Sequence, residues 1–394
     1  MRMPLLRACT HRLIPLLLLS AVLSGCSLTV TVDNGTPTNG SSTTLPAPPT
    51  IPPETSNVEC TQTLSTSDDL QKALDQTKPS DVLCLSGGTY TLNDTLTIQT
   101  SGENDHPITL RSAPGQHAVI DGPDSDPALE LQKANWWLLT DLEITGSDIL
   151  LRLNGSNDNE VTRSIFHDAG GECIRFRNQS QRNRFTDNVV YTCGLQGFNV
   201  KKGHKNGEGL YIGTAPEQRN RIDGQMDHSN NNVVERNWFR TDGSEAVDIK
   251  EDSEQNIVRN NTGIGSKDPD GGIFGARGDN NQFLNNTAMG GTGAGFRAGG
   301  DDVSKGEHGQ PSDRVYGKNN VFRDNVAEGN QGYGYRFMTW PQDVDCSNTG
   351  SDNGDGLYYV DNEDIHLTCP EISGSPASGT PPPELRLRIN ASLE

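Results

Sequence analysis

Short segments in which apolar and polar residues alternate follow one another along most of the chain, and glycine and asparagine separate them. The pattern Asn-x-(Val/Phe)-x-x-Asn recurs in these segments. Its copies start at Asn183, Asn232, Asn256, Asn281 and Asn320, and a degenerate copy occupies 159–164. Successive starts lie 24, 49, 24, 25 and 39 residues apart, which indicates a period of 24–25 with one double step and one step enlarged by an insertion at 299–314. A fixed period of this length predicts a β-solenoid.

A solenoid also explains the composition of the chain. Only 32% of the residues are hydrophobic, and 43 are glycine, whereas a large sandwich or α/β core needs more apolar side chains. Stacked coils bury only a narrow core. Asparagine suits the turns because it tolerates the left-handed backbone region, and its side chains can hydrogen-bond from coil to coil. A leucine-rich repeat has a similar period, but its leucine ladder is absent here.

These features resemble the pectate-lyase-like superfamily of parallel β-helices. Residues 66–92 are similar to the N-terminal cap of such proteins, with Ser67 expected to cap a short helix that buries Leu70, Ala73 and Leu74. Residues 106–122 are similar to an early coil. The resemblance covers about residues 60–370. It implies an all-β, right-handed, single-stranded parallel β-helix with a short N-terminal capping helix.

The N-terminus has the features of an export signal. Three arginines within residues 2–12 precede the apolar run 13–23, which is too short to span a membrane comfortably. The sequence LSGC at 23–26 resembles the bacterial lipobox, which implies that Cys26 carries a lipid and begins the mature chain. An ordinary signal peptide is the alternative, and export follows from both.

The composition then divides the chain into four predicted regions. These are a lipoprotein signal peptide (1–25), a flexible tether (26–58), the β-helix domain (59–372), and a Pro-rich break with a C-terminal strand or cap (373–394). The tether is rich in Thr, Ser, Gly, Asn and Pro, which cannot offset the entropy of ordering. We therefore expect a domain held at the bacterial cell envelope, either facing the periplasm from the outer membrane or at the cell surface, with the lipid as its only membrane contact.

Six cysteines remain after the signal and the lipid site. They are Cys60, Cys84, Cys173, Cys193, Cys346 and Cys369. An exported location favours disulfides, and the clustering of these cysteines in pairs suggests bridges between sequence neighbours. Six cysteines allow fifteen connectivities, among which the sequence does not choose.

The net charge constrains the partners. It is −20 for the whole chain and becomes −23 when the three signal arginines are removed. An acidic protein is a poor ligand for nucleic acid, so we expect none. A polyanionic substrate would need a local basic patch or bridging cations. The protein is expected to be a monomer.

A strand with outward polar side chains follows most of the asparagine motifs. The outward positions hold Arg175, Arg177, Lys201, Tyr211, Asp248, Lys250, Arg297 and Arg336. Because coils stack about 4.8 Å apart, these side chains should form one row. Its cations and Tyr211 are predicted to bind an extended acidic polysaccharide. The alternative is that the cations pair with neighbouring acids on a solvated sheet.

Within this row, Glu245-x-x-x-x-Lys250, followed one coil later by Gly-Ala-Arg277-Gly, resembles the sixth polysaccharide lyase family, which contains alginate lyases and chondroitinase B. The resemblance implies Lys250 as the Brønsted base, Arg277 as the acid or electrostatic partner, and Glu245 as a calcium ligand. The step from Lys250 to Arg277 is slightly longer than one period.

A second departure concerns the metal ligands. The acid that this family carries two residues before the Glu is Gly243 here. Asp248 and Glu251 are candidates for the missing carboxylates, so the predicted calcium ligands are Glu245, Asp248 and Glu251.

These residue types suit β-elimination. A proton must leave the carbon beside the uronate carboxylate, and a cation on that carboxylate stabilises the charge that develops. Lys250 can accept the proton only when neutral, and nearby positive charge lowers the pKa of a lysine. The neighbouring acids act in the opposite direction unless a cation occupies them.

A polysaccharide lyase is therefore the leading interpretation. A mannuronan C5-epimerase-like enzyme would share the proton abstraction. A glycoside hydrolase would need two acids flanking one subsite, and the sequence assigns no second acid on a neighbouring coil. In the non-enzyme alternative, a lipid-anchored surface protein binds a glycan along the same row.

The lipobox generates a direct test. The substitution Cys26→Ala should abolish incorporation of a labelled fatty acid, because Cys26 is the cysteine of the lipobox and carries the predicted lipid. Equal labelling of the variant and the wild type would remove the lipid anchor.

Overall fold

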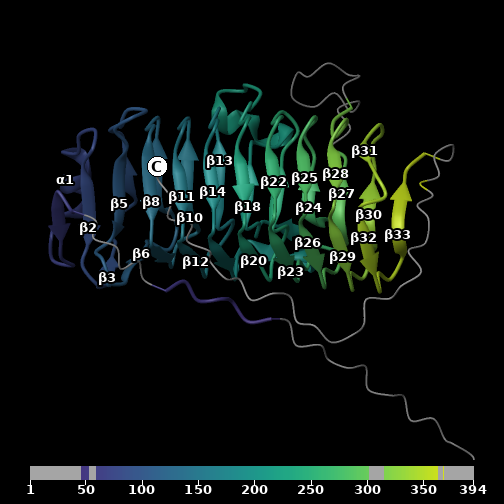
Figure 1. Cartoon of the computed structure of the whole chain (residues 1–394), viewed down its shortest axis with the longest axis horizontal. Coiled ribbons are helices and arrows are strands. Elements are labelled where there is room, and N and C mark those ends of the chain that lie inside the picture. The colour runs from purple at the N-terminus through teal and green to yellow at the C-terminus, as the bar shows by residue number, and fades with distance from the viewer. Residues whose placement is uncertain (1–45, 53–58, 301–314, 363–366, 368–394) are drawn as a thin grey trace, which may run out of the picture. The chain divides into compact units, whose positions relative to one another are not determined.

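The computed structural model describes residues 46–52, 59–300, 315–362 and 367. Three long parallel sheets, named A, B and C here, dominate this part of the chain (Figure 1). Each coil adds one strand to sheet A, then one to B, then one to C, as β11, β12 and β13 do. The predicted single-stranded parallel β-helix is confirmed.

The strands have the following bounds. Sheet A contains β1 (Gln62–Leu64), β2 (Val82–Leu85), β5 (Ile108–Ser112), β8 (Trp137–Thr140), β11 (Glu160–Thr162), β14 (Arg184–Thr186), β19 (Val233–Glu235), β22 (Ile257–Arg259), β25 (Gln282–Leu284), β28 (Val321–Arg323) and β31 (Asp343–Val344). Sheet B contains β3 (Gly88–Thr91), β6 (Ala118–Asp121), β9 (Leu142–Thr145), β12 (Ile165–His167), β15 (Val189–Tyr191), β20 (Trp238–Arg240), β23 (Thr262–Ile264), β26 (Thr287–Met289), β29 (Val326–Glu328) and β32 (Thr349–Ser351). Sheet C contains β4 (Leu96–Ile98), β7 (Pro127–Gln132), β10 (Ile149–Asn154), β13 (Ile174–Arg177), β18 (Leu210–Ile212), β21 (Val247–Ile249), β24 (Gly272–Ala276), β27 (Ala294–Ala298), β30 (Tyr333–Phe337) and β33 (Gly356–Val360).

Buried asparagines tie successive coils together, as predicted. The backbone N–H and the side-chain amide of Asn232 both donate to Oδ1 of Asn256, at 2.9 and 3.0 Å. Asn256 donates in the same way to Asn281 one coil further on. A second ladder runs through Asn237, Asn261 and further asparagines. Because these side chains are buried, their amides need the partners that only a fixed stacking register supplies.

Stacked apolar side chains fill the space between the sheets. On sheet C, Phe274, Phe296 and Tyr335 stack on successive coils with ring centroids 5.3 and 5.0 Å apart. All three are fully buried. Each such side chain contributes roughly 1.5–3 kcal/mol through burial, so a narrow core is sufficient when it is repeated in every coil.

The 49-residue step is one coil, so the predicted double step is wrong. Strand β14 pairs directly with β19, and Asn183 N–H donates to Asn232 Oδ1 at 2.9 Å. The extra residues form an antiparallel pair, β16 (Phe198–Asn199) with β17 (His204–Lys205), the 3₁₀ turn η1 (Val200–Lys202) between them, and η2 (Pro216–Ile222) after β18. The 39-residue step is one coil with an insertion, as predicted, because β25 pairs with β28.

A short helix, α1 (Leu70–Asp75), precedes β2 and buries Leu70, Ala73 and Leu74 as expected. Its N-cap is Asp69, whose carboxylate accepts the Lys72 N–H at 2.9 Å, and not Ser67. Both residue types suit an N-cap. Because the helix begins at Leu70, the residue at the N-cap position is Asp69.

Two disulfides link sequence neighbours, as the clustering suggested: Cys60–Cys84 and Cys173–Cys193. Cys346 is also disulfide-bonded. Cys369, Cys26 and the predicted C-terminal cap at 373–394 lie outside the described residues.

Residues 46–52, which fall within the predicted tether, contact sheet B. Ile51 packs against a cluster of Val189, Trp238 and Ile264. Arg163 Nη2 donates to the carbonyl oxygen of Pro52 at 3.1 Å. Within the described part of the chain, no helix has the length and apolar character needed to cross a bilayer.

The asparagine ladder generates a stability prediction. Asn256→Leu should lower the free energy of unfolding by roughly 2–4 kcal/mol, because the two buried donors of Asn232 lose their acceptor at about 1–3 kcal/mol each. Urea denaturation would measure it. The exposed Asn319→Asp is the matched control and should change stability little, because Asp also tolerates the left-handed backbone (φ 57°). Similar midpoints for the two variants would contradict the structural role of the ladder.

Candidate active site

The outward face of sheet C carries the predicted row of charges. The register aligns, from coil to coil, Glu130, Arg152, Arg175, Tyr211, Asp248, Gly275, Arg297, Arg336 and Tyr359. The neighbouring inward residues, such as Ile212 and Ile249, are fully buried. The labels β13, β18, β24, β27 and β30 mark this sheet in Figure 1, and β21 lies between β18 and β24.

Lys250 and Arg277 directly follow β21 and β24 on successive coils, as predicted. Their preceding residues, Ile249 and Ala276, are register partners. Lys250 occupies the outward position that the sequence predicts, but it is only 7% exposed. Although it lies on the outer face, the side chains around it exclude most of the solvent.

Two carboxylates lie against the Lys250 ammonium. Nζ lies 2.5 Å from Asp248 Oδ2 and 3.8 Å from Glu208 Oε1. Burial by itself lowers the pKa of Lys250, but the combined attraction of the neighbouring acidic groups, Asp248 above all, outweighs it and raises this pKa well above its usual value. Lys250 is therefore a cation in this state.

Glu208, Glu245 and Asp248 form a cluster in which one oxygen from each lies within 4.8 Å of the others. Burial raises the pKa of Glu208 to about 8 against the attraction of Lys250. Burial and the charge of Asp248 also raise the pKa of Glu245. Full ionisation of the cluster would therefore place more buried negative charge there than one lysine can balance.

The cluster fits a calcium ion in its chemistry. Calcium prefers carboxylate and other oxygen ligands. Asp248 Oδ1 is buried and has no hydrogen-bond partner among the described residues. A Cβ at Gly275 would lie 2.5 Å from this oxygen, and one at Gly271 would lie 2.6 Å from Glu245 Oε1. The two glycines thus keep space at the carboxylate oxygens.

Glu251, predicted as a ligand, is not part of this cluster. Its carboxylate Oε1 accepts from Arg277 Nε at 2.7 Å and pairs with Nη2 at 2.6 Å. Glu208 takes its place. Glu208 and Glu245 occupy equivalent positions on successive coils, two residues before the register partners Leu210 and Val247, so correct pairing of β18 with β21 would have revealed the ligand set.

Tyr211 lies between two cations. The Arg175 guanidinium is 4.3 Å from the ring centroid, and Lys250 Nζ is 4.1 Å from it. Burial raises the pKa of Tyr211 to about 12. Its hydroxyl accepts the Ala215 N–H at 3.2 Å, so it is a protonated phenol held beside Lys250.

The predicted basic row divides into two groups. Arg175 is 2% exposed and donates hydrogen bonds to Glu172 and to Gln218 of η2. These bonds hold its guanidinium against the ring of Tyr211. Arg177, Arg297 and Arg336 are partly exposed, and none of them has a carboxylate at ion-pair distance among the described residues.

Burial and like charges lower the pKa of two of these arginines. Arg177, near Arg152 and Arg175, reaches about 10, and the pKa of Arg297 is lowered by burial and Arg277. Both are cations that a ligand anion would stabilise.

Lys201 is not in the row, which corrects its prediction. It lies in η1, between β16 and β17, and is exposed. The sequence 197–202 alternates like a strand, but its residues belong to the insertion. Lys205 connects the insertion to the segment before β24, because its Nζ pairs with Asp268 at 2.9 Å and with Asp270 at 2.7 Å.

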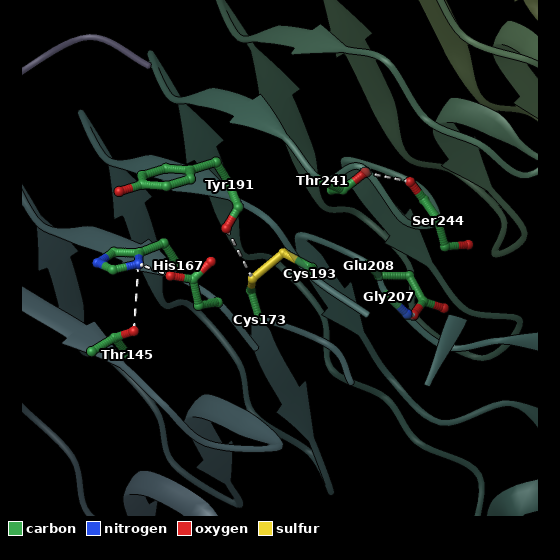
Figure 2. The surroundings of a disulfide bond; sticks show 10 residues. Thr145, His167, Cys173, Tyr191, Cys193, Gly207, Glu208, Thr241 and Ser244 are labelled. Carbon is green, nitrogen blue, oxygen red and sulfur yellow. Dashed lines mark hydrogen bonds and ion pairs between the residues drawn. A yellow bond between two sulfur atoms is a disulfide. The ribbon is translucent and has the colours of Figure 1, made fainter. Parts of the chain in front are cut away.

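The Cys173–Cys193 disulfide supports the carboxylate cluster from one side (Figure 2). Cys173 N–H donates to the carbonyl oxygen of Glu208 at 2.8 Å. Ser244, which also appears in Figure 2, donates through its hydroxyl to the carboxylate of Glu245. The disulfide therefore fixes the strand edge from which Glu208 projects.

Comparison with known proteins identifies the same fold. A family model described as "Pel9A-like, right handed beta helix region" matches residues 52–194, and one described as "Right handed beta helix region" matches 147–305. Pectate lyase PEL9 of Emericella nidulans is 26% identical over 154 residues, which are 35% of this chain and 36% of that protein. The chain thus spans little more than a third of this relative.

Two solved structures extend the likeness over most of the chain. An alginate lyase from Paenibacillus sp. str. FPU-7 has a TM-score of 0.61 at 22% identity, covering 76% of this chain and 98% of that one. Pectate lyase Pel9A has a TM-score of 0.50 at 15% identity, covering 79% and 81%. The parallel sheets and the matched family regions support the resemblance to the pectate-lyase-like superfamily, and the solved structures show the same right-handed parallel β-helix fold.

Proposed function

We propose that this protein is a polysaccharide lyase that cleaves a uronate-containing polysaccharide by β-elimination on the outer face of sheet C. The observation that carries the proposal is the buried Lys250, which contacts the carboxylates of Asp248 and Glu208 and the ring of Tyr211 beside a row of arginines. The names of the similar proteins, pectate lyase and alginate lyase, support the same substrate class. Export and a lipid at Cys26 belong to the proposal and would hold the enzyme at the cell envelope.

Lys250 is the proposed base. Its ammonium must first lose a proton, and the ion pair with Asp248 opposes that loss. Calcium held by Glu208, Glu245 and Asp248 would compensate these carboxylates and stabilise negative charge on a bound uronate. Neutral Lys250 would then take the proton from the sugar carbon beside the carboxylate.

The leaving glycosidic oxygen needs a proton, and two groups near Lys250 can assist it. Arg277 is paired with Glu251 and remains a cation, so its role is electrostatic. Tyr211 carries a proton at neutral pH because burial raises its pKa to about 12. We propose Tyr211 as the proton donor and Arg277 as a stabiliser of the developing charge.

The arginines without carboxylate partners are proposed to bind the polymer. Arg297 and Arg336 are register partners on the coils beyond Gly275, and Arg177 lies on the opposite side of Lys250 along sheet C. Sugar carboxylates would therefore meet cations on both sides of the base, which favours a substrate several sugars long.

Lys250→Gln tests the proposed base. It should lower kcat roughly 10²–10⁴-fold, the usual contribution of positioned proton transfer, as measured by the ultraviolet absorbance of the unsaturated product from alginate, pectate or glucuronan. Lys250→Arg should also be inactive, because it keeps the positive charge but does not deprotonate. Lys205→Gln is the matched control, since it too removes a carboxylate-paired ammonium, and it should retain turnover.

Two results would decide against the lyase. Full activity in Lys250→Arg would exclude Lys250 as the base. If the wild type binds uronate polymers but produces no unsaturated product, a C5 proton-exchange assay in deuterated water separates an epimerase from a non-catalytic glycan-binding protein.

Arg297→Ala should raise KM for the polymer several-fold and leave kcat nearly unchanged, because a lost substrate contact removes ground-state and transition-state binding equally. It should also weaken the salt dependence of KM, since one charge contact is removed. Arg323→Ala, on sheet A and paired with Asp343, is the control. An equal effect of both substitutions would refute a specific contact at Arg297.

Calcium should raise the melting temperature of the wild type, and a chelator should reverse this. At a free concentration 100 times Kd the stabilisation is about 2.7 kcal/mol. Asp248→Asn and Glu245→Gln should abolish the calcium-dependent shift, whereas Glu251→Gln should keep it, because the Glu251 carboxylate already pairs with Arg277. Loss of the shift in Glu251→Gln as well would restore Glu251 to the ligand set, as expected from the sequence.

A further inference from the structure

Sheet A carries a hollow of about 290 Å³ where strands β8, β11 and β14 begin. Its lining combines two tryptophans with apolar, polar and charged residues: Trp136, Trp137, Leu138, Asn104, Pro107, Asp158, Asn159, Glu160, Arg182 and Arg184. Leu138, Glu160 and Arg184 are register partners on three successive coils. Strands β8 and β11 are neighbours in Figure 1. No group of the proposed active site lines this hollow.

Trp136 occupies a backbone position where an aromatic residue is unfavourable. It has a φ of 60°, in the left-handed region that bulky residues avoid. The residue before each ladder position adopts this conformation in the following coils: Asp158, Arg182, Asn231, Gln255, Asn280 and Asn319. All of these are polar or charged, and several are asparagines, which tolerate this region best. The repeat therefore explains the backbone at Trp136 but not the choice of tryptophan.

Burial in the core does not offset the unfavourable backbone conformation of Trp136. Its neighbour Trp137 is 1% exposed and donates through its indole nitrogen to the carbonyl oxygen of Thr100 at 2.8 Å. Trp136 is partly exposed, and its indole nitrogen donates to none of the described residues. A strained residue that packs neither in the core nor against a hydrogen-bond partner points to a ligand.

The charges around Trp136 are already compensated. Arg182 donates to both carboxylate oxygens of Asp158, at 2.7 and 2.8 Å. Arg184 lies 4.0 Å from Glu160 and 3.8 Å from Glu235. The hollow thus offers an indole face beside donors and acceptors without excess charge. This combination suits a pyranose ring, whose C–H face stacks on indole while its hydroxyls hydrogen-bond at the edge.

The hollow and Lys250 lie on the two sides of the corner that leads from sheet C to sheet A. Trp136 precedes β8, and Lys250 lies in the turn that leads from sheet C to β22. Strands β8 and β22 are four steps apart in the order of sheet A. At roughly 4.8 Å per coil, the separation of their coils along the solenoid axis is about 19 Å. A chain of several sugars has this length.

We propose that Trp136 forms a distal sugar-binding subsite, which holds a pyranose ring of the same acidic polysaccharide that reacts at Lys250. This inference rests on the proposed function for the identity of the polymer. The subsite anchors long chains and lies out of reach of a short oligosaccharide bound at Lys250.

Trp136→Asn tests the subsite without harming the fold, because asparagine occupies this position in other coils and accepts its backbone conformation. The melting temperature should be unchanged or higher. Gln255→Asn, at the equivalent position four coils further on, is the matched control. Affinity electrophoresis in alginate, pectate and glucuronan gels would measure polymer binding directly, independently of turnover.

Trp136→Asn should weaken polymer binding about 2- to 10-fold, the range expected for one aromatic stacking contact. It should raise KM for polymer but not for a trisaccharide, and leave kcat unchanged. Unchanged polymer binding in a folded variant would overturn the inference, and so would an equal loss for polymer and trisaccharide. If the wild type cleaves nothing, the proposed function fails, while a difference in gel retardation between wild type and Trp136→Asn still supports the subsite.

Discussion

The register of the stacked coils is the constraint on which the rest of the structure depends. Each ladder asparagine, such as Asn256, is fully buried and must satisfy its amide through the coils on both sides. A slip of one residue would break these bonds and would also exchange inward and outward side chains on every strand. Because both penalties act together, the outer face of sheet C presents a fixed set of side chains at coil intervals.

This fixed spacing permits an arrangement of charge that would otherwise separate. Glu208, Glu245 and Asp248 repel one another, and burial strengthens that repulsion. They remain together because each projects from a strand whose position the ladders and the core determine. Part of the stability of the scaffold therefore offsets the strain in the cluster, and Lys250 is the counter-ion that the chain itself supplies. Such opposed groups are typical of sites that bind a cation or move a proton.

The sequence predicted the features that depend on local pattern. The Asn-x-x-x-x-Asn motif identified the ladder residues, and alternation placed Asp248, Lys250 and Arg297 on one face. The prediction from sequence was wrong where an insertion made one coil nearly two periods long. The step of 49 residues equals nearly two coils, so 197–202 was read as a strand and Lys201 as part of the row.

Glu208 shows a second limit of the sequence. Its equivalence to Glu245 becomes visible only when β18 is known to pair with β21. Long-range pairing also decided that Glu251 would meet Arg277 and leave the carboxylate cluster. Local sequence carries no information on either contact, because both depend on which coils become neighbours after the insertions are accommodated.

The insertions themselves show why a solenoid can change its loops and keep its sites. The coil that contains η1 and η2 is about twice the length of its neighbours, yet β14 still pairs with β19 and the ladder continues through Asn183 and Asn232. The added residues extend outward from the solenoid and do not increase the distance between successive coils along its axis. The separation between Trp136 and Lys250 is therefore set by the number of coils between them and not by the number of residues. A polymer that contacts both must match that spacing, so the coil count of the β-helix would define the shortest substrate able to use the whole surface.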